Sequence, residues 1–146
     1  MGLRPYFSRR TFLNWLSGLG IFAFFGCAVE DDPKKPRIVG LSNVSLLREG
    51  PNLFELERLV VFKERSELYV ISLVCTHQTC LLRAPVTAGE GFFCPCHSSE
   101  FDSQGAVLKG PATEPLPHYE LTVNEKGFLQ ANLSAKVPAD WRLKLA

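Results

Sequence analysis

The residues with metal-binding chemistry are concentrated in two short segments of this chain. Residues 75–80 read CTHQTC, and residues 94–99 read CPCHSS. Together they contain four of the five cysteines and two of the three histidines in 146 residues. Thiolates and imidazoles are the ligands that zinc and iron–sulfur clusters take. We therefore expect a metal centre built from both segments.

The spacing within each segment helps to distinguish a zinc site from an iron–sulfur cluster. Structural zinc sites usually combine cysteine pairs roughly two to four residues apart with histidine pairs roughly three to five apart. Here one segment offers Cys75-x-His77 and the other Cys94-x-x-His97, one thiolate and one imidazole each. This alternation suits a two-iron cluster in which one iron takes two thiolates and the other two imidazoles. Zinc is the alternative.

The two segments resemble the cluster-binding boxes of the Rieske family, C-x-H and C-x-x-H on two loops. The resemblance implies one 2Fe–2S cluster with four ligands, which are Cys75, His77, Cys94 and His97. It also implies that Cys80 and Cys96 form a disulfide between the loops, as in the branch found in cytochrome bc and bf complexes. An oxidising compartment permits such a bond. Two free thiols or spare ligands are the alternative.

Three further positions around the ligands carry expectations from the same resemblance. Ser99 stands where the family has a serine that hydrogen-bonds a bridging sulfide. Phe101 stands where high-potential members have a tyrosine that donates to a cysteine sulfur, and phenylalanine has no donor. Residues 110–112, GPA, resemble the proline loop that covers the cluster from the other side. The third histidine, His118, is expected to be an ordinary surface residue.

The chain departs from the family pattern beside the ligands. Gln78–Thr79 replaces a usual leucine–glycine pair, and Ser98 replaces a usual glycine. Because glycine often marks a backbone position with positive φ, we expect the loop geometry to differ. Gln78 also places a polar group where bc-type proteins present an apolar docking surface, which puts a quinol site in doubt.

Mixed ligation has a direct electrochemical consequence. Two neutral imidazoles in place of anionic thiolates lower the negative charge of the cluster, so Rieske potentials lie at roughly −150 to +300 mV against about −400 mV for plant-type ferredoxins. Added negative charge on reduction raises the proton affinity of a neighbouring imidazole. One electron and one proton can therefore be taken up together, as quinol oxidation requires. By resemblance, the imidazole facing quinol is that of His97.

From Ile38 onward the pattern is that of short strands and turns. The predicted strands are rich in β-branched and aromatic residues and are residues 53–62, 67–74, 91–93, 118–123 and 127–133. We predict a mainly β fold, a small antiparallel Rieske-type domain over residues 38–134 whose loops bind the cluster. Residues 135–146 are expected to form a C-terminal tail with, at most, one helical turn.

An uncharged segment precedes the β region. The nineteen residues Thr11–Val29 carry no charge, and at about 1.5 Å per residue a helix of that length spans a bilayer core of roughly 30 Å. Arg4, Arg9 and Arg10 come before it, and the acidic residues 30–32 follow. This asymmetry predicts one N-terminal transmembrane helix with the remainder of the chain outside the cytoplasm. A cleaved signal peptide is the alternative.

The string SRRTFL, residues 8–13, resembles a twin-arginine export signal. That route carries folded proteins, which suits a cluster assembled before export. Residues 1–29 are thus expected to be signal and anchor. Residues 30–37, EDDPKKPR, are expected to be a tether, or else an ordinary surface loop. Lipidation at Cys27 is a further alternative.

The charge balance, 16 basic against 15 acidic residues, argues against a nucleic-acid partner. The leading hypothesis is the iron–sulfur subunit of a membrane quinol-oxidising complex of the cytochrome bc or bf type. Its partners would be a cytochrome b-type subunit, quinol and a c-type cytochrome, with the cluster domain on the periplasmic side of a bacterial inner membrane. The alternative is the small subunit of a periplasmic molybdenum oxidoreductase of the arsenite-oxidase type. An oxygenase ferredoxin fits less well, because that class is cytoplasmic and lacks the second cysteine pair.

Overall fold

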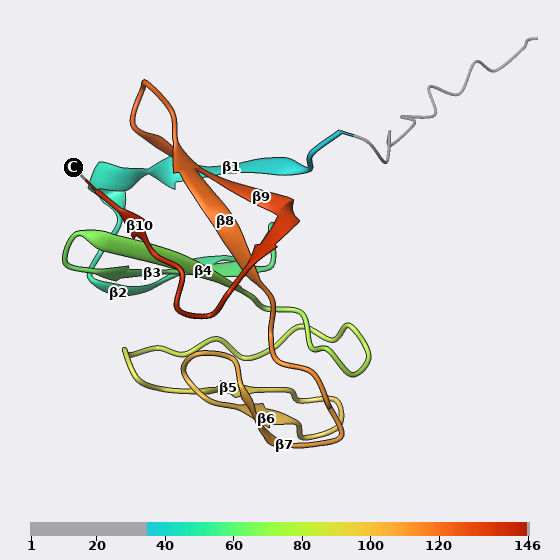
Figure 1. The fold of residues 1–146 in the computed structure, drawn as a ribbon. Helices are drawn as coiled ribbons and strands as arrows, with labels where there is room; N and C mark the ends of the chain where they lie inside the picture. Colours follow the sequence, from blue (N-terminus) through green and yellow to red (C-terminus); the bar gives the residue numbers. More distant parts are fainter. Residues whose placement is uncertain (1–34, 146) are drawn as a thin grey trace, which may run out of the picture. The chain divides into compact units, whose positions relative to one another are not determined.

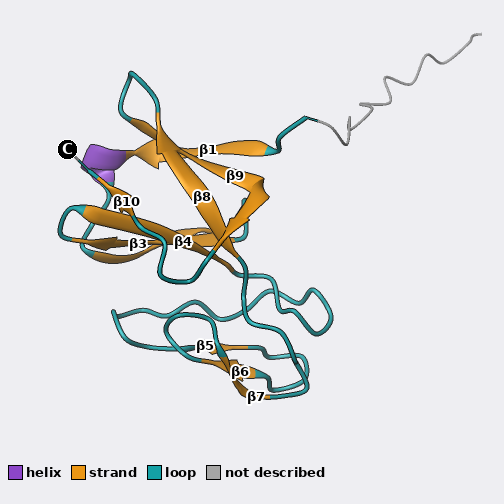
Figure 2. Cartoon of the chain, viewed as in Figure 1, coloured by secondary structure: helices purple, strands orange, loops and turns teal. Residues whose placement is uncertain are grey.

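The computed structural model describes residues 35–145, which belong to one compact unit. The regular structure in this part of the chain consists of antiparallel β strands and a single 3-10 turn at Val44–Leu46, and loops join these elements (Figure 2). Among these residues no helix is long and apolar enough to cross a bilayer. The predicted signal, the anchor Thr11–Val29 and most of the tether lie outside the described residues.

Seven strands form the larger sheet. They are β1 (Ile38–Asn43), β2 (Gly50–Phe54), β3 (Leu59–Glu64), β4 (Glu67–Ser72), β8 (His118–Val123), β9 (Phe128–Val137) and β10 (Leu143–Lys144). Their order is β1-β9-β8-β4-β3-β2, and β10 pairs with β4. The strands predicted at residues 118–123 and 127–133 are confirmed as β8 and β9, which pair as a hairpin, and Gly127 in its turn has a φ of +79°.

A second layer, here called the cluster lobe (residues 75–117), lies between β4 and β8 in the chain (Figure 1). It contains a three-stranded sheet of β5 (Phe92–Phe93), β6 (Glu100–Phe101) and β7 (Val107–Lys109). Its strands are short, and most of the lobe is loop. The lobe therefore depends on its packing against the larger sheet.

The two layers share one of the two apolar cores. In β3, Val60 and Phe62 face the core that also contains Phe92 and Phe101 of the cluster lobe. Alternate residues of the same strand face the second core on the opposite side of the sheet. Because β3 and β4 are buried on both faces, their sequences are continuous apolar runs. The core thus holds the site-bearing loops directly against the central strands.

Two predicted elements differ from the structure. Residues 53–62, predicted as one strand, contain a turn at residues 55–58 between β2 and β3, where Arg58 has a φ of +55°. Three charged residues in this stretch favour an exposed turn. The expected tail, residues 135–146, instead completes β9 and forms β10. Its half-buried Trp141 packs against the second core, which explains why the segment follows the sheet.

Candidate metal centre

The two predicted cluster loops have the same backbone hydrogen bonds. In the first, the Thr79 N–H donates to the Cys75 carbonyl (2.9 Å) and the Cys75 N–H donates to the Cys80 carbonyl (2.8 Å). In the second, the Ser98 N–H donates to the Cys94 carbonyl (3.0 Å), and the Cys94 N–H donates to the Ser99 carbonyl (2.9 Å). The two loops are therefore equivalent turns, each built around one cysteine.

The thiols of Cys75 and Cys94 are buried and form no disulfide. Cys75 and Cys94 are each 1% exposed and contact one another through their side chains. Burial raises the pKa of Cys75, N–H groups of His77 and Gln78 partly oppose this, and the Cys94 sulfur raises the pKa further. Burial also opposes ionisation of Cys94, but N–H groups of Cys96 and His97 together with the Cys75 thiol lower its pKa. Backbone dipoles in both loops thus point at the sulfurs and favour anionic ligands.

The two histidines predicted as ligands, His77 and His97, lie next to each other. The rings of His77 and His97 are 4.8 Å apart between centroids and almost perpendicular. His77 is half-buried and His97 is exposed. The buried Nδ1 of His77 finds no hydrogen-bond partner among residues 35–145. Since a buried polar atom is normally satisfied, this orphaned nitrogen fits a metal ligand. The predicted ligands thus form two contacting pairs on the same two loops, a buried pair of thiols and a more exposed pair of imidazoles.

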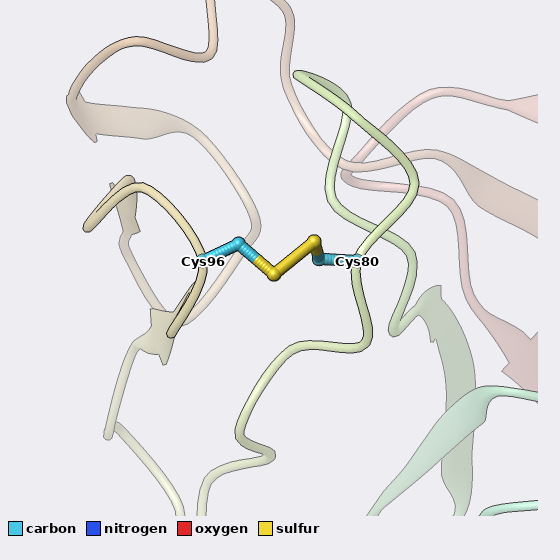
Figure 3. The surroundings of a disulfide bond; sticks show 2 residues. All are labelled: Cys80 and Cys96. Atoms are coloured by element: carbon cyan, nitrogen blue, oxygen red, sulfur yellow. A yellow bond between two sulfur atoms is a disulfide. The ribbon is translucent and has the colours of Figure 1, made fainter.

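A disulfide joins the two loops, as the resemblance implies. Cys80 and Cys96 are bonded across the gap between their loops, with Cα atoms 6.6 Å apart (Figure 3). Their sulfurs lie within 4.8 Å of the Cys94 sulfur. Because they are bonded to each other, they are not ligands. The alternatives of free thiols and spare ligands are therefore excluded for this pair.

Ser99 connects the second loop to residues 110–112. Its side chain is fully buried, and its Oγ accepts the Ala112 N–H at 3.0 Å. A hydroxyl that accepts one hydrogen bond keeps its own hydrogen for another acceptor. The serine therefore keeps one donor beside Cys94. Phe101 is 1% exposed and belongs to the same core cluster as Cys75 and Cys94.

The two residues that stand where the family usually has glycine both have positive φ. Thr79 has a φ of +55° and Ser98 a φ of +60°. Both residues occupy the left-handed region that glycine would favour, so the expected change in loop geometry does not appear there. The β-branched Thr79 is strained in this region. Gln78, next to it, is exposed, as its polar side chain predicts.

The expectation for His118 was wrong. The residue is 4% exposed, and its Nε2–H donates to the Gln104 carbonyl at 2.9 Å. Its Nδ1 is also buried and has no partner among the described residues. Pro117 and a strand start suggested a surface position, but the cluster lobe covers this end of β8. The signal was missed because the covering residues are distant in sequence.

Two loops that each offer a cysteine and a histidine have the arrangement predicted for an iron–sulfur cluster with mixed ligation. The model of the Rieske 2Fe–2S domain matches residues 38–120. The chain therefore belongs to the Rieske family, and it carries one 2Fe–2S cluster. The matched residues begin with β1 and end in β8, so they include both loops and the proline segment.

Curated relatives match parts of the chain. The ubiquinol–cytochrome c reductase iron–sulfur subunit of Blastochloris viridis is 41% identical over 64 residues, which are 42% of this chain and 36% of the relative. The Rieske subunit of the mitochondrial cytochrome b-c1 complex of Bos taurus is 37% identical over 84 residues, 56% and 28% respectively. The chain thus spans about a third of the length of these relatives.

Solved structures also match. The plasma-membrane Rieske protein of Synechocystis PCC 6803 is 27% identical, with a TM-score of 0.48. The match covers 64% of this chain and 98% of that one. The ferredoxin of carbazole 1,9a-dioxygenase from Nocardioides aromaticivorans IC177 is 23% identical with a TM-score of 0.47, covering 65% and 96%.

Proposed function

We propose that this chain transfers single electrons through a cluster held by Cys75, His77, Cys94 and His97. The observation that carries the proposal is the arrangement of these four side chains, with free buried thiols on one side and paired imidazoles on the other. The cluster supplies one-electron chemistry at a potential raised by its neutral ligands. The protein excludes water from the sulfurs and leaves one imidazole edge open to a redox partner.

The exposed imidazole of His97 provides the proton-transfer group. Its ring is solvent-accessible, whereas His77 is half-buried beneath it. A ring nitrogen of His97 that faces solvent can accept a proton from a donor such as quinol and release it to water. We propose that this proton transfer accompanies electron transfer. Ser99, whose hydroxyl hydrogen is not used by Ala112, would donate to the cluster.

We further propose that the chain is the iron–sulfur subunit of a quinol-oxidising complex of the cytochrome bc or bf type. Support comes from the printed names of the relatives, several of which are subunits of such complexes. The partners would be a cytochrome b-type subunit, quinol and a c-type cytochrome. The uncharged segment Thr11–Val29 would be the membrane anchor, and the charges on either side of it would put the cluster domain on the periplasmic side.

Purification of the full chain with its native partners tests this assignment. The tagged chain is extracted from native membranes in a mild detergent, and the complex is analysed for haem and metals. We expect b-type and c-type haem to copurify in fixed proportion to the chain. Copurification of molybdenum without b-type haem would instead support the arsenite-oxidase type. A Cys75→Ser variant controls for association that does not need the cluster.

A further inference from the structure

Gln104 of the cluster lobe is held by side chains from three separate parts of the larger sheet. Its Nε2 donates to the Tyr69 hydroxyl of β4 at 3.3 Å. Its Oε1 accepts from Arg142, between β9 and β10, at 2.9 Å. Its backbone carbonyl accepts from His118 of β8 at 2.9 Å. The side chain of Gln104 thus uses its donor and its acceptor on the sheet.

The three side chains that hold Gln104 also contact one another. The guanidinium of Arg142 lies 3.9 Å from the centroid of the Tyr69 ring. The His118 ring is nearly parallel to that of Tyr69, with centroids 6.2 Å apart. The Tyr69 hydroxyl donates in turn to Glu64 at 3.0 Å. Cation–π and charge-assisted contacts at a partly buried place are stronger than their exposed equivalents. These contacts hold Tyr69, His118 and Arg142 in place around Gln104, and we call these three side chains the cage.

The turn that carries Gln104 is itself rigid. The carboxylate of Asp102 accepts from the N–H groups of Gln104 (2.9 Å) and Ala106 (2.8 Å). The Gly105 carbonyl accepts from Leu116 at 2.8 Å, and a Cβ at Gly105 would lie 2.9 Å from the Leu116 Cβ. A displacement of Gln104 would therefore move the backbone of the whole β6–β7 turn.

This turn directly follows the residues beside the proposed cluster. Ser99 and Phe101 lie five and three residues before Gln104, joined by β6. We infer that Gln104, caged by the sheet, is a positioning residue that sets the Ser99 hydroxyl and the Phe101 ring against the cluster. The inference rests on the proposed ligands and on the proposed role of Ser99. It makes the C-terminal segment, through Arg142, part of the control of the cluster.

Arg142→Ala tests the inference with two matched variants. Arg142→Lys retains a donor for Gln104 but cannot reproduce the planar contact with Tyr69. Lys144→Ala removes a cation two residues away, whose side chain is 81% exposed. Each is made in the full chain and measured with the cluster present. The readouts are the reduced-cluster paramagnetic resonance spectrum, the reduction potential, and amide hydrogen exchange at Ala112, whose N–H reports its bond to Ser99.

We expect Arg142→Ala to keep its iron and sulfide but to shift the resonance spectrum and lower the potential. Amide exchange at Ala112 should accelerate about tenfold or more. In this variant, local opening no longer has to break the contacts of Arg142 with Gln104 and Tyr69. Arg142→Lys should restore part of each change, and Lys144→Ala should match the wild type.

A lower melting temperature in Arg142→Ala with unchanged spectrum, potential and Ala112 exchange would overturn the inference and leave a purely structural role. An unchanged melting temperature with those three readouts also unchanged would overturn it as well. If the wild-type chain itself holds no iron–sulfur cluster, the proposed function fails first, and the inference fails with it. The metal analysis of the wild type separates these two failures.

Discussion

Thr79 and Ser98 occupy equivalent positions in the two cluster loops. Each is the fourth residue after its cysteine, each donates its N–H to that cysteine's carbonyl, and each has a positive φ, +55° and +60° respectively. A residue with a Cβ in this region costs roughly 1–2 kcal/mol relative to glycine. The loops therefore carry backbone strain beside the proposed metal ligands.

Replacing these residues by glycine should relieve that strain. We expect Thr79→Gly and Ser98→Gly each to stabilise the protein by about 0.5–1 kcal/mol, after the greater entropy of glycine in the unfolded chain is subtracted. Thr113→Gly is the control, because Thr113 is also exposed but does not have a positive φ. Thermal unfolding should show a gain for the first two variants and a loss for the control. A lower stability in all three variants would contradict the presence of backbone strain at Thr79 and Ser98.

The potential should respond to a single hydroxyl at residue 101. Phe101 is buried in the core that also contains both thiols, at the position where high-potential members of the family have tyrosine. Phe101→Tyr should therefore add a donor to a proposed ligand sulfur and stabilise the reduced state. A hydrogen bond to a charged group is worth about 1.5–3 kcal/mol, so the potential should rise by tens of millivolts and by no more than roughly 130 mV. Film voltammetry measures it. Phe93→Tyr, on the adjacent strand, should leave the potential unchanged.

The wild-type potential follows from the same argument. Without a donor at Phe101, it should lie below that of bc-type proteins with tyrosine there, which suits a lower-potential quinone such as menaquinone. A potential in Phe101→Tyr that is unchanged or lower, with the cluster spectrum intact, would show that the ring does not take the tyrosine's place.

The Cys80–Cys96 bond should protect the cluster. It links two residues that are 16 apart in sequence. A cross-link that closes a loop of about that size raises the free energy of the unfolded chain, and so stabilises the folded protein, by roughly 3 kcal/mol. Cys80→Ser should therefore retain the metal ligands but lose the cluster's visible absorbance faster on heating. The double variant with Cys96→Ser should behave like the single one, because either change removes the same bond. A wild-type rate of loss in both would contradict the stabilising role.

His118 should make stability depend on pH. Burial lowers its pKa and nearby Arg142 lowers it further, whereas the Gln104 carbonyl and Asp102 partly offset these effects. The unfolded residue titrates near about pH 6.5, so the unfolded chain binds more protons below that value. This contribution to stability is complete above that pH and is lost as the pH falls, at up to about 1.4 kcal/mol per pH unit.

His118→Gln separates this effect from other acid effects. Glutamine keeps a donor for the Gln104 carbonyl but does not titrate. The melting temperature of the wild type should fall more steeply between neutral and mildly acidic pH than that of the variant. Parallel curves would contradict the assignment to His118.

Local patterns predicted the strands whose partners are adjacent in sequence. The polar turn before Glu67 and the β-branched run after it indicated the β3–β4 hairpin, which the structure contains. The proposed ligand positions rest on equally local patterns, because each loop carries its own cysteine and histidine. The turn within residues 53–62 was missed because Leu56, 95% exposed, continued the apolar pattern.

Contacts between distant segments were not predictable from these patterns. Tyr69, Gln104, His118 and Arg142 come from four elements, and nothing in their local sequence marks them as neighbours. Only the return of the C-terminal segment to β4 brings Arg142 over Tyr69. His118 was misplaced for the same reason, since its burial depends on the turn that contains Gln104.

The ligand set is tested most directly by pulsed paramagnetic resonance of the reduced full chain with nitrogen-15-labelled histidine. The chain has only three histidines. We predict coupling to two histidine nitrogens, assigned to His77 and His97, which persists unchanged in His118→Gln. Absence of any cluster signal, with zinc bound instead, would contradict the account. So would a histidine coupling that disappears when His118 is replaced.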